Sequence, residues 1–438
     1  MGAACGRGPG LRAYLRSYLI LSFTLALAGC AGQVLSPSLN PNVPEGLTPT
    51  APYPQSSSSP GGYGKTSGNI LVLLPLTGQL APVGAALDNA VKLAAPAGVS
   101  QSIDIRDTGG TPGGAAAAAQ AGIAAGDGII IGPLTAAETQ AVVPLAKAAG
   151  VNMLPFTNDG TLAQPGVWPL GITPAQSVQR TLQVASDAGR TQLAALLPDT
   201  EFGHHLSDAI TAETQALSEP APQIAFYEPG FDSVNQAVDQ ISDFASRGQG
   251  LMDQIKAAKA DNSAAGRAKM RDLQHQQVPP PSFNALFIGE TDENTLAEIA
   301  NFLPYYDVSA PQVQFLGPAP WANIATDMAH QPVFLGALYA APDPAAAQAF
   351  QAKYQAAYGS APPAIADVAF DATALARVAG ASGGYTSNVL TAPAGFTGTD
   401  GLVVLNPDGS VKRGLAVFSI APGAPVISAP APSSFNQP

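Results

Sequence analysis

Charged residues, histidine and cysteine are all scarce in this sequence, and their scarcity excludes several kinds of site. Only 11% of the 438 residues are charged, and the chain has four histidines and two cysteines. His204 and His205 are adjacent, so on a helix they point about 100° apart and do not form a joint metal site. The motifs H-E-x-x-H and G-x-S-x-G are absent. We therefore predict a protein that is not an enzyme and holds no metal and no cofactor.

A glycine-rich run at residues 109–114 (GGTPGG) is the one segment that superficially resembles a phosphate loop. It lacks the Lys-Ser/Thr pair of a P-loop and the spacing of the dinucleotide motif G-x-G-x-x-G. The run therefore predicts a turn that leads into a helix.

The N-terminus has the features of a secretory signal. Residues 1–29 contain three arginines and no acid, and the apolar run at 18–28 is too short to span a bilayer. The run ends in Leu-Ala-Gly-Cys, which resembles the bacterial lipobox and predicts lipidation of Cys30. An ordinary secretory signal with a chance cysteine is the alternative. Removal of the signal would eliminate Cys5 and leave no possible intramolecular disulfide.

Acidic residues outnumber basic ones. The net charge is −12, and without the three arginines of the signal 16 basic residues face 31 acidic ones, a net charge of −15. This balance argues against nucleic acid and against an anionic membrane surface as partners. We expect the protein in the cell envelope, facing the periplasm on its lipid anchor. Ala31 replaces the aspartate that usually retains lipoproteins in the inner membrane, which favours the outer membrane.

Two segments predict extended or irregular chain. Residues 30–68 are rich in proline and serine and have almost no apolar pattern, which is typical of a tether. Residues 422–438 are again rich in proline, alanine and serine, and we expect a disordered tail.

Between these ends, short apolar runs alternate with helical patterns, which predicts an α/β protein with parallel sheets. The first half has strand-like runs at residues 69–74, 102–106, 128–132 and 151–156. The second half repeats the alternation, with runs at residues 192–197, 224–227, 285–289 and 313–317. A helical insertion at 232–282 interrupts this second half. Residues 401–405 and 415–420 flank an Asn-Pro-Asp-Gly turn and predict a hairpin.

The order of several short motifs resembles the type I periplasmic-binding fold across residues 69–421. The motifs are ILVLLPLTGQL at 70–80, IIGP at 130–133, FLG at 315–317 and FDA at 370–372. The resemblance implies two doubly wound parallel-sheet lobes joined by three crossovers, with a cleft between them. Lobe 1 would comprise residues 69–172 and part of 360–400. Lobe 2 would comprise 173–342, with the insertion, and the hairpin at 401–420.

The insertion makes the chain similar to the penicillin-binding-protein activator lipoproteins. These proteins stimulate peptidoglycan synthases at the outer membrane, so the resemblance implies a penicillin-binding protein as partner. The predicted tether stands where the longer members have a helical-repeat domain. The alternative is a receptor similar to leucine/isoleucine/valine-binding proteins, which would bind a branched-chain amino acid or related small molecule and an ABC permease.

The resemblance also indicates where a ligand cleft would lie. In amino-acid receptors of this fold, small hydroxyls and backbone N–H groups bind the ligand carboxylate, an acid binds its ammonium and an aromatic ring packs on it. The matching positions here are Thr135, Ala136, Phe156, Thr157, Asn158, Phe202 and, as the nearest acid, Glu290.

The insertion carries an unusual share of the basic residues. Six of the 16 that follow the signal fall in one short stretch: Arg247, Lys256, Lys259, Arg267, Lys269 and Arg271. The pattern indicates a docking element for an acidic partner or for anionic cell wall; a solvated helical hairpin is the alternative.

Overall fold

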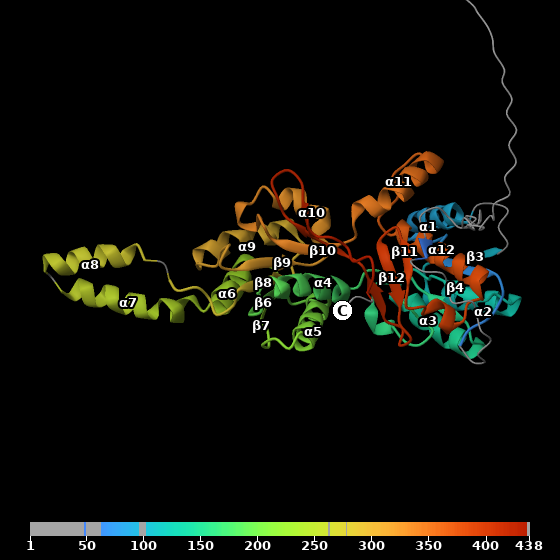
Figure 1. Cartoon of the computed structure of the whole chain (residues 1–438), viewed down its shortest axis with the longest axis horizontal. Coiled ribbons are helices and arrows are strands. Elements are labelled where there is room, and N and C mark those ends of the chain that lie inside the picture. Colours follow the sequence, from blue (N-terminus) through green and yellow to red (C-terminus); the bar gives the residue numbers. More distant parts are fainter. Residues whose placement is uncertain (1–47, 50–62, 96–101, 262, 277, 436–438) are drawn as a thin grey trace, which may run out of the picture. The chain divides into compact units, whose positions relative to one another are not determined.

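The computed structural model describes residues 48–49, 63–95, 102–261, 263–276 and 278–435, and Figure 1 shows their helices and strands. Three sheets organise these residues: a four-stranded parallel sheet, a seven-stranded mixed sheet and a four-stranded antiparallel sheet. The first two sheets are covered by helices on both faces, which confirms the predicted α/β class with two doubly wound lobes.

The first sheet is parallel throughout. Its strands are, in spatial order, β3 (Ile103–Asp107), β2 (Ile70–Leu74), β4 (Ile129–Ile131) and β5 (Asn152–Leu154). Every residue of β2, β4 and β5 is buried, as strands covered on both faces require.

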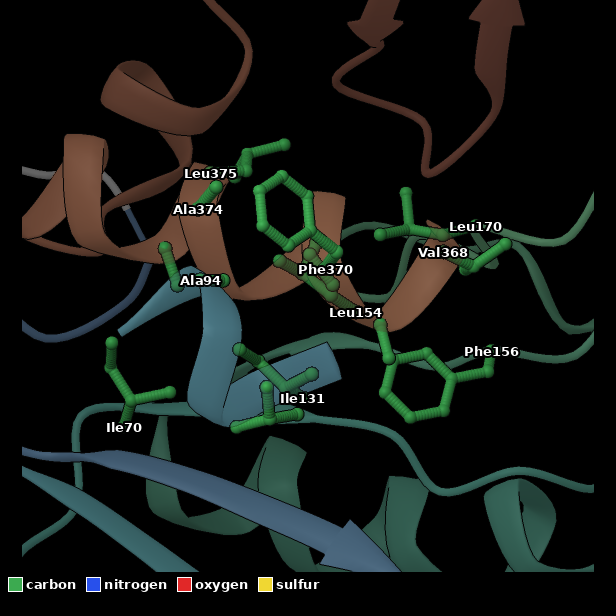
Figure 2. Close-up of a cluster of buried hydrophobic side chains, with 14 of the residues drawn as sticks. Ile70, Ala94, Ile131, Leu154, Phe156, Leu170, Val368, Phe370, Ala374 and Leu375 are labelled. Atoms are coloured by element: carbon green, nitrogen blue, oxygen red, sulfur yellow. The ribbon is translucent and has the colours of Figure 1, made fainter. Parts of the chain in front are cut away.

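Alternate residues of β2 enter two different cores. Ile70, Val72 and Leu74 pack with α1 (Ala81–Ala94) and α12 (Ala366–Ser382), and Figure 2 shows Phe370 and Leu375 of α12 in this core. Leu71 and Leu73 pack with the other pair of helices. That pair is α2 (Pro112–Ala125) and α3 (Ala136–Ala149).

The second sheet has five parallel strands and two antiparallel ones at one edge. In spatial order they are β15 (Val426–Ala429), β14 (Ala416–Ser419), β10 (Leu338–Ala341), β9 (Gln314–Gly317), β8 (Ala285–Ile288), β6 (Leu193–Pro198) and β7 (Gln223–Tyr227). One face packs against α4 (Pro174–Asp187) and α5 (Glu201–Ala216). The other packs against α6 (Phe231–Ser242), α9 (Glu293–Tyr305) and α10 (Trp321–Met328).

A glycine near the start of a helix recurs in both lobes. Gly84 of α1 lies against the carbonyl oxygen of Pro75, and Gly203 of α5 lies against that of Pro198. A Cβ at either position would overlap the carbonyl, so only glycine lets the helix begin this close to the preceding strand.

The third sheet corrects the predicted C-terminal hairpin. The strand β12 (Gly401–Leu405) pairs with β13 (Val411–Arg413), not with residues 415–420. Its other neighbour is β11 (Phe396–Gly398), which pairs in turn with β1 (Thr48–Pro49). The turn was placed correctly, but the chain leaves this sheet after β13 and continues as β14 beside β10.

Segments of the predicted tether and of the predicted disordered tail form defined structure. Two parts of the supposed tether are ordered: β1 joins the third sheet, and the Tyr63 hydroxyl donates to the carbonyl oxygen of Lys147 over 3.2 Å. The supposed tail contributes β15, which pairs with β14, and Pro430 accepts a hydrogen bond of 2.9 Å from Arg180. Strand pairing and side-chain hydrogen bonds therefore hold parts of both segments against the folded chain. Cys30 and the rest of residues 1–47 lie outside the described part.

The remaining elements are helical. They are η1 (Gly160–Leu162), α7 (Phe244–Ala260), α8 (Ala264–Gln274), η2 (Pro332–Phe334), α11 (Pro344–Tyr358) and α13 (Ser387–Leu390). The predicted insertion thus contains α6, α7 and α8. Within the described ranges, we find no helix with the length and apolar character needed to cross a bilayer.

Side-chain hydrogen bonds join the segment that leads from the first sheet to the second to the segment that leads from the third sheet to the second. The Trp168 indole donates to the carbonyl oxygen of Asn406 over 2.7 Å, and the Gln176 amide donates to that of Val411 over 2.6 Å. Arg413 donates to the carbonyl oxygen of Leu170. The first passage (155–173) is therefore bonded to the last one (405–415).

Arg413 also belongs to a buried cluster of charges. Its guanidinium lies 3.3 Å from the Asp400 carboxylate. The Asp371 carboxylate accepts a hydrogen bond from the Thr399 N–H, 2.9 Å from each oxygen. Burial, followed by the nearby Asp400, raises the pKa of Asp371 to about 7. The pKa of Asp367 is raised well above its ordinary value by burial and then by Asp400 and Asp371. One guanidinium thus faces three carboxyl groups, which favours protonation of some of them.

Replacing Asp371 by asparagine is expected to remove part of the pH dependence of stability. The folded protein holds a proton on Asp371 that the unfolded chain releases between about pH 4 and about pH 7, so stability falls as the pH rises through this window. The free energy of unfolding of Asp371→Asn should therefore rise relative to the unsubstituted protein across the window. The gain is on the order of 1.4 kcal/mol per unit of pKa displacement, measured by urea unfolding.

Asp408→Asn is the matched control, because hydrogen bonds from the Ser410 hydroxyl and N–H lower the pKa of Asp408. This variant should lose stability relative to the unsubstituted protein as the pH rises through about pH 4. If the two variants changed in the same direction, the raised pKa of Asp371 would be refuted.

Candidate functional site

The carboxyl ends of β2 and β3 carry loops that are locked to each other. The Asp107 carboxylate accepts hydrogen bonds from the N–H groups of Leu76 (2.8 Å), Thr77 (3.1 Å) and Gly109 (2.8 Å), and from the Thr77 hydroxyl (2.6 Å). These bonds, led by that of the Thr77 hydroxyl, lower the pKa of Asp107. The glycine-rich run is a turn into α2, in which Gly109 and Gly110 have φ of +62° and +67°. The Asp107 carboxylate at this edge of the sheet therefore already has hydrogen-bond donors from its own two loops.

Thr135 and Ala136 lie where β4 leads into α3, and the Thr135 hydroxyl is already bonded. Thr135 is the N-cap of α3, and its hydroxyl and N–H donate to the Glu138 carboxylate over 2.8 and 3.1 Å. Glu138 is fully buried, and its carboxylate also accepts a hydrogen bond of 2.6 Å from the Thr108 hydroxyl. Thr135 therefore caps a helix and links two loops, and Ala136 is the half-buried first residue of that helix.

Phe156, Thr157 and Asn158 follow β5 and have three different environments. Phe156 is buried in the core beneath α12, which Figure 2 shows, so its assignment as a cleft residue is corrected. The Thr157 side chain is largely buried, and its hydroxyl accepts a hydrogen bond of 3.1 Å from the N–H of Asp159. Asn158 is exposed. Of these three predicted residues, Asn158 alone has an accessible side chain.

In the second lobe, Phe202 and Glu290 lie after β6 and β8. Phe202 is half-buried in the first turn of α5 and packs against the core on that face of the sheet. The Glu290 carboxylate accepts hydrogen bonds from the Tyr227 hydroxyl (2.8 Å) and from the N–H groups of Thr291 (2.7 Å) and Asp292 (2.8 Å). It is 9% exposed. Glu290 is thus bonded within its own lobe, and a ligand ammonium would compete with three existing donors.

Tyr227 and Glu138 are the partners that the sequence reasoning missed. Burial, and secondarily Glu290, raises the pKa of Tyr227 above its ordinary value, so this hydroxyl remains a donor. The spacing of Thr135 and Glu138 is that of a capping box, which was readable in the sequence. Tyr227 had no comparable signal, because its contact with Glu290 joins residues 63 positions apart.

A small apolar pocket lies beside the buried charge cluster, but it is too small for an amino acid. It is lined by Leu170, Asp371, Leu375, Phe396, Gly398, Val403 and Arg413, and has room for about one water molecule.

The basic residues of the insertion divide into one that anchors and five that are exposed. Arg247 donates to the carbonyl oxygens of Pro279 (2.6 Å) and Tyr306 (2.7 Å), and its guanidinium lies 5.7 Å from the centre of the Phe244 ring. Arg247 is half-buried and fixes the base of α7 through these contacts. The exposed residues are Lys256, Lys259, Arg267, Lys269 and Arg271. Figure 1 shows α7 and α8 side by side, and they pack mainly on each other.

Replacing Glu290 by alanine is expected to lower the free energy of unfolding by about 2–3 kcal/mol, because the buried Tyr227 hydroxyl and two backbone N–H groups lose their acceptor. Urea unfolding of Glu290→Ala, Tyr227→Phe and the double variant measures the coupling between the two side chains. We expect the double variant to lose less stability than the two single variants together.

Glu290→Gln is the control, since its amide oxygen can still accept from Tyr227. Unchanged stability of Glu290→Ala would contradict the structural role of this carboxylate.

Comparison with known proteins places this architecture in a family. The profile described as periplasmic binding protein matches residues 69–395. A search of curated protein sequences finds no match. Solved structures with a similar fold include full-length LpoA from Haemophilus influenzae, with a TM-score of 0.59 and 16% identity. The match extends over 84% of this chain and 60% of the LpoA chain.

Two other structures match over nearly their whole length. The LpoA (YraM) C-domain from Haemophilus influenzae, a regulator of PBP1A, has a TM-score of 0.58 and 16% identity, with 82% of this chain covering all of it. A putative branched-chain amino acid ABC transporter from Rhodospirillum rubrum has a TM-score of 0.61 and 16% identity, with 82% of this chain covering 99% of it. At this identity the likeness shows the fold alone. With three quarters of its length matched by the family profile, the chain belongs to the periplasmic binding protein family.

Proposed function

We propose that the protein is a non-enzymatic lipoprotein of the cell envelope that binds and activates a penicillin-binding protein. The observation that carries the proposal is the hairpin α7–α8, which packs mainly on itself and exposes five basic side chains. An element of this kind suits contact with another protein better than capture of a small solute. The fold is also that of the LpoA C-domain, a regulator of PBP1A.

The predicted cleft residues support the same choice. An amino-acid receptor needs a carboxylate for the ligand ammonium and free donors for its carboxylate. Here the Glu290 carboxylate accepts three hydrogen bonds within its lobe, and the Thr135 hydroxyl donates to Glu138. A ligand would have to displace these bonds at a cost of about 1 kcal/mol or more each.

A solute receptor of an ABC importer is the second candidate. Its support is the fold of the Rhodospirillum rubrum protein, which this chain covers almost completely. In that case the two lobes would close on a branched-chain amino acid or a related molecule, and the ligand would stabilise the closed state.

Addition of the purified protein to the penicillin-binding protein of the same organism is expected to raise its rate of glycan-strand synthesis, measured with lipid II as substrate. A variant in which a short Gly-Ser linker replaces residues 250–274 should not stimulate the enzyme. It keeps Arg247 and its two hydrogen bonds, so the second lobe should remain folded, which circular dichroism checks.

Absence of binding and of stimulation would refute the activator role. A thermal-shift screen with leucine, isoleucine and valine examines the second candidate in parallel. A ligand at 100 times its Kd should stabilise a receptor by about 2.7 kcal/mol.

Replacing Cys30 by alanine is expected to move the protein from the membrane fraction to the soluble periplasmic fraction. Each acyl chain contributes about 0.8 kcal/mol per buried CH₂, so two or three chains hold a protein stably at a bilayer. Fractionation followed by immunoblotting measures the change. Cys5→Ala is the matched control and should leave the distribution unchanged, because this cysteine lies in the segment that we expect to be removed. A Cys30→Ala protein that stayed in the membrane fraction would exclude lipidation at this residue.

A further inference from the structure

The helices α7 and α8 pack along a narrow seam of small and apolar residues. Buried or half-buried positions recur every three or four residues, as expected for two helices in contact. On α7 they are Gly248, Leu251, Ile255 and Ala258, and on α8 they are Gly266, Met270 and Leu273. The seam fixes which side chains lie to each side of it.

One side of the seam is basic on both helices. Successive helical residues are rotated by about 100°, so Met252, Lys256 and Lys259 leave α7 on the same side of its seam residues. Because α8 runs antiparallel to α7, the matching side of α8 is the one that carries Arg267 and Arg271. All five side chains are exposed, and we call this surface the basic face.

The other side of the seam has a different composition. It carries Gln254 and Asp261 from α7 and its C-cap, and Ala265, Lys269 and Asp272 from α8. Asp253 points away from the seam, and its carboxylate accepts a hydrogen bond of 3.1 Å from the Gln249 amide. The basic face therefore has four cationic groups and no acid, and the opposite face has one cationic group and two acids.

Like charges are neighbours on the basic face of each helix. Arg267 and Arg271 are four positions apart, and Lys256 and Lys259 are three positions apart. Such pairs repel each other, although Lys259 and Arg271 also lie in the last turns of their helices, where a cation is favourable. An acidic partner docked on this face would relieve the repulsion.

We infer that the basic face is the surface that docks on an acidic patch of the penicillin-binding protein. The inference rests on the proposed function for the identity of the partner, while the arrangement of charge stands on the structure. Charge complementarity indicates that the partner's surface is acidic. The chain as a whole has a net charge of −12 and would repel such a surface, whereas the basic face attracts it.

The side chain of Met252 favours a protein over an anionic lipid or polymer as the occupant. It is 62% exposed and lies among the four cationic groups, where one flexible apolar side chain can fill a small socket in a protein surface. Insertion into a bilayer needs a larger apolar face, and a polyanion needs none.

The test compares two variants of the full-length protein with the same change in formal charge. Lys256→Glu/Lys259→Glu alters the basic face by four charges, and Gln254→Glu/Ala265→Glu/Lys269→Glu alters the opposite face by four. Binding of each to the immobilised, purified penicillin-binding protein is measured by surface plasmon resonance at about 50 mM and about 300 mM sodium chloride. We expect the first variant to bind about tenfold or more weakly at low salt, mainly through slower association, and the second to stay within about twofold.

Each other outcome overturns a distinct claim. If the unsubstituted protein does not bind the enzyme, the proposed function fails and the partner named here fails with it. If it binds and both variants weaken equally, or neither weakens, the basic face is not the docking surface. Vesicles of phosphatidylglycerol and phosphatidylethanolamine provide the third measurement: loss of vesicle binding by the first variant, with enzyme binding intact, would replace the protein partner by an anionic surface.

Discussion

Burial of parallel strands on both faces is the constraint on which the rest of this structure depends. Alternate residues of β2 enter two different cores, and the inner strands β6, β8, β9 and β10 of the second sheet are likewise covered by helices on each side. Such strands have no solvent-facing side chains to offer a partner or a ligand. Recognition therefore falls to the loops at the strand ends, to the edge strands and to elements added to the fold.

The strand-end loops are largely engaged with one another. Asp107 joins the loops after β2 and β3, and Glu138 joins those after β3 and β4. Glu290 holds the turn after β8 against Tyr227 of β7. The Glu138 and Glu290 carboxylates accept from buried hydroxyls that would otherwise remain unpaired, whereas the bonds of Asp107 are exposed. Two of the polar groups that the resemblance assigns to a ligand, Thr135 and Glu290, therefore already have a structural role.

Local patterns in the sequence predicted the strands and helices of both lobes, because apolar runs and helical spacing are properties of neighbouring residues. They failed where a long-range pairing decides the structure. Residues 415–420 have the pattern of a strand, but only β10 determines that they join the second sheet. Val426 and Ile427 are about half exposed, and their strand exists because β14 offers a free edge.

The predicted site divides in the same way. Phe156 was readable as a core residue, since residues 154 and 156 on one side of an extended chain share a face, and Leu154 is in the same core. The capping box of Thr135 and Glu138 was readable as well. The role of Arg247 was not, because its acceptors on Pro279 and Tyr306 depend on how the second lobe folds around the base of α7.

The topology gives a reason to regard α7 and α8 as a functional addition. The chain must cross from β7 to β8 past β6, and α6, which packs on the sheet through Val234 and Val238, is enough to cover that crossover. The next 31 residues that form α7, α8 and the turn between them add little to the core of the second sheet. They also gather four cationic groups and no acid on one of their two faces. An element that adds little to the core and gathers charge of one sign on one face is best explained by a contact made outside the chain.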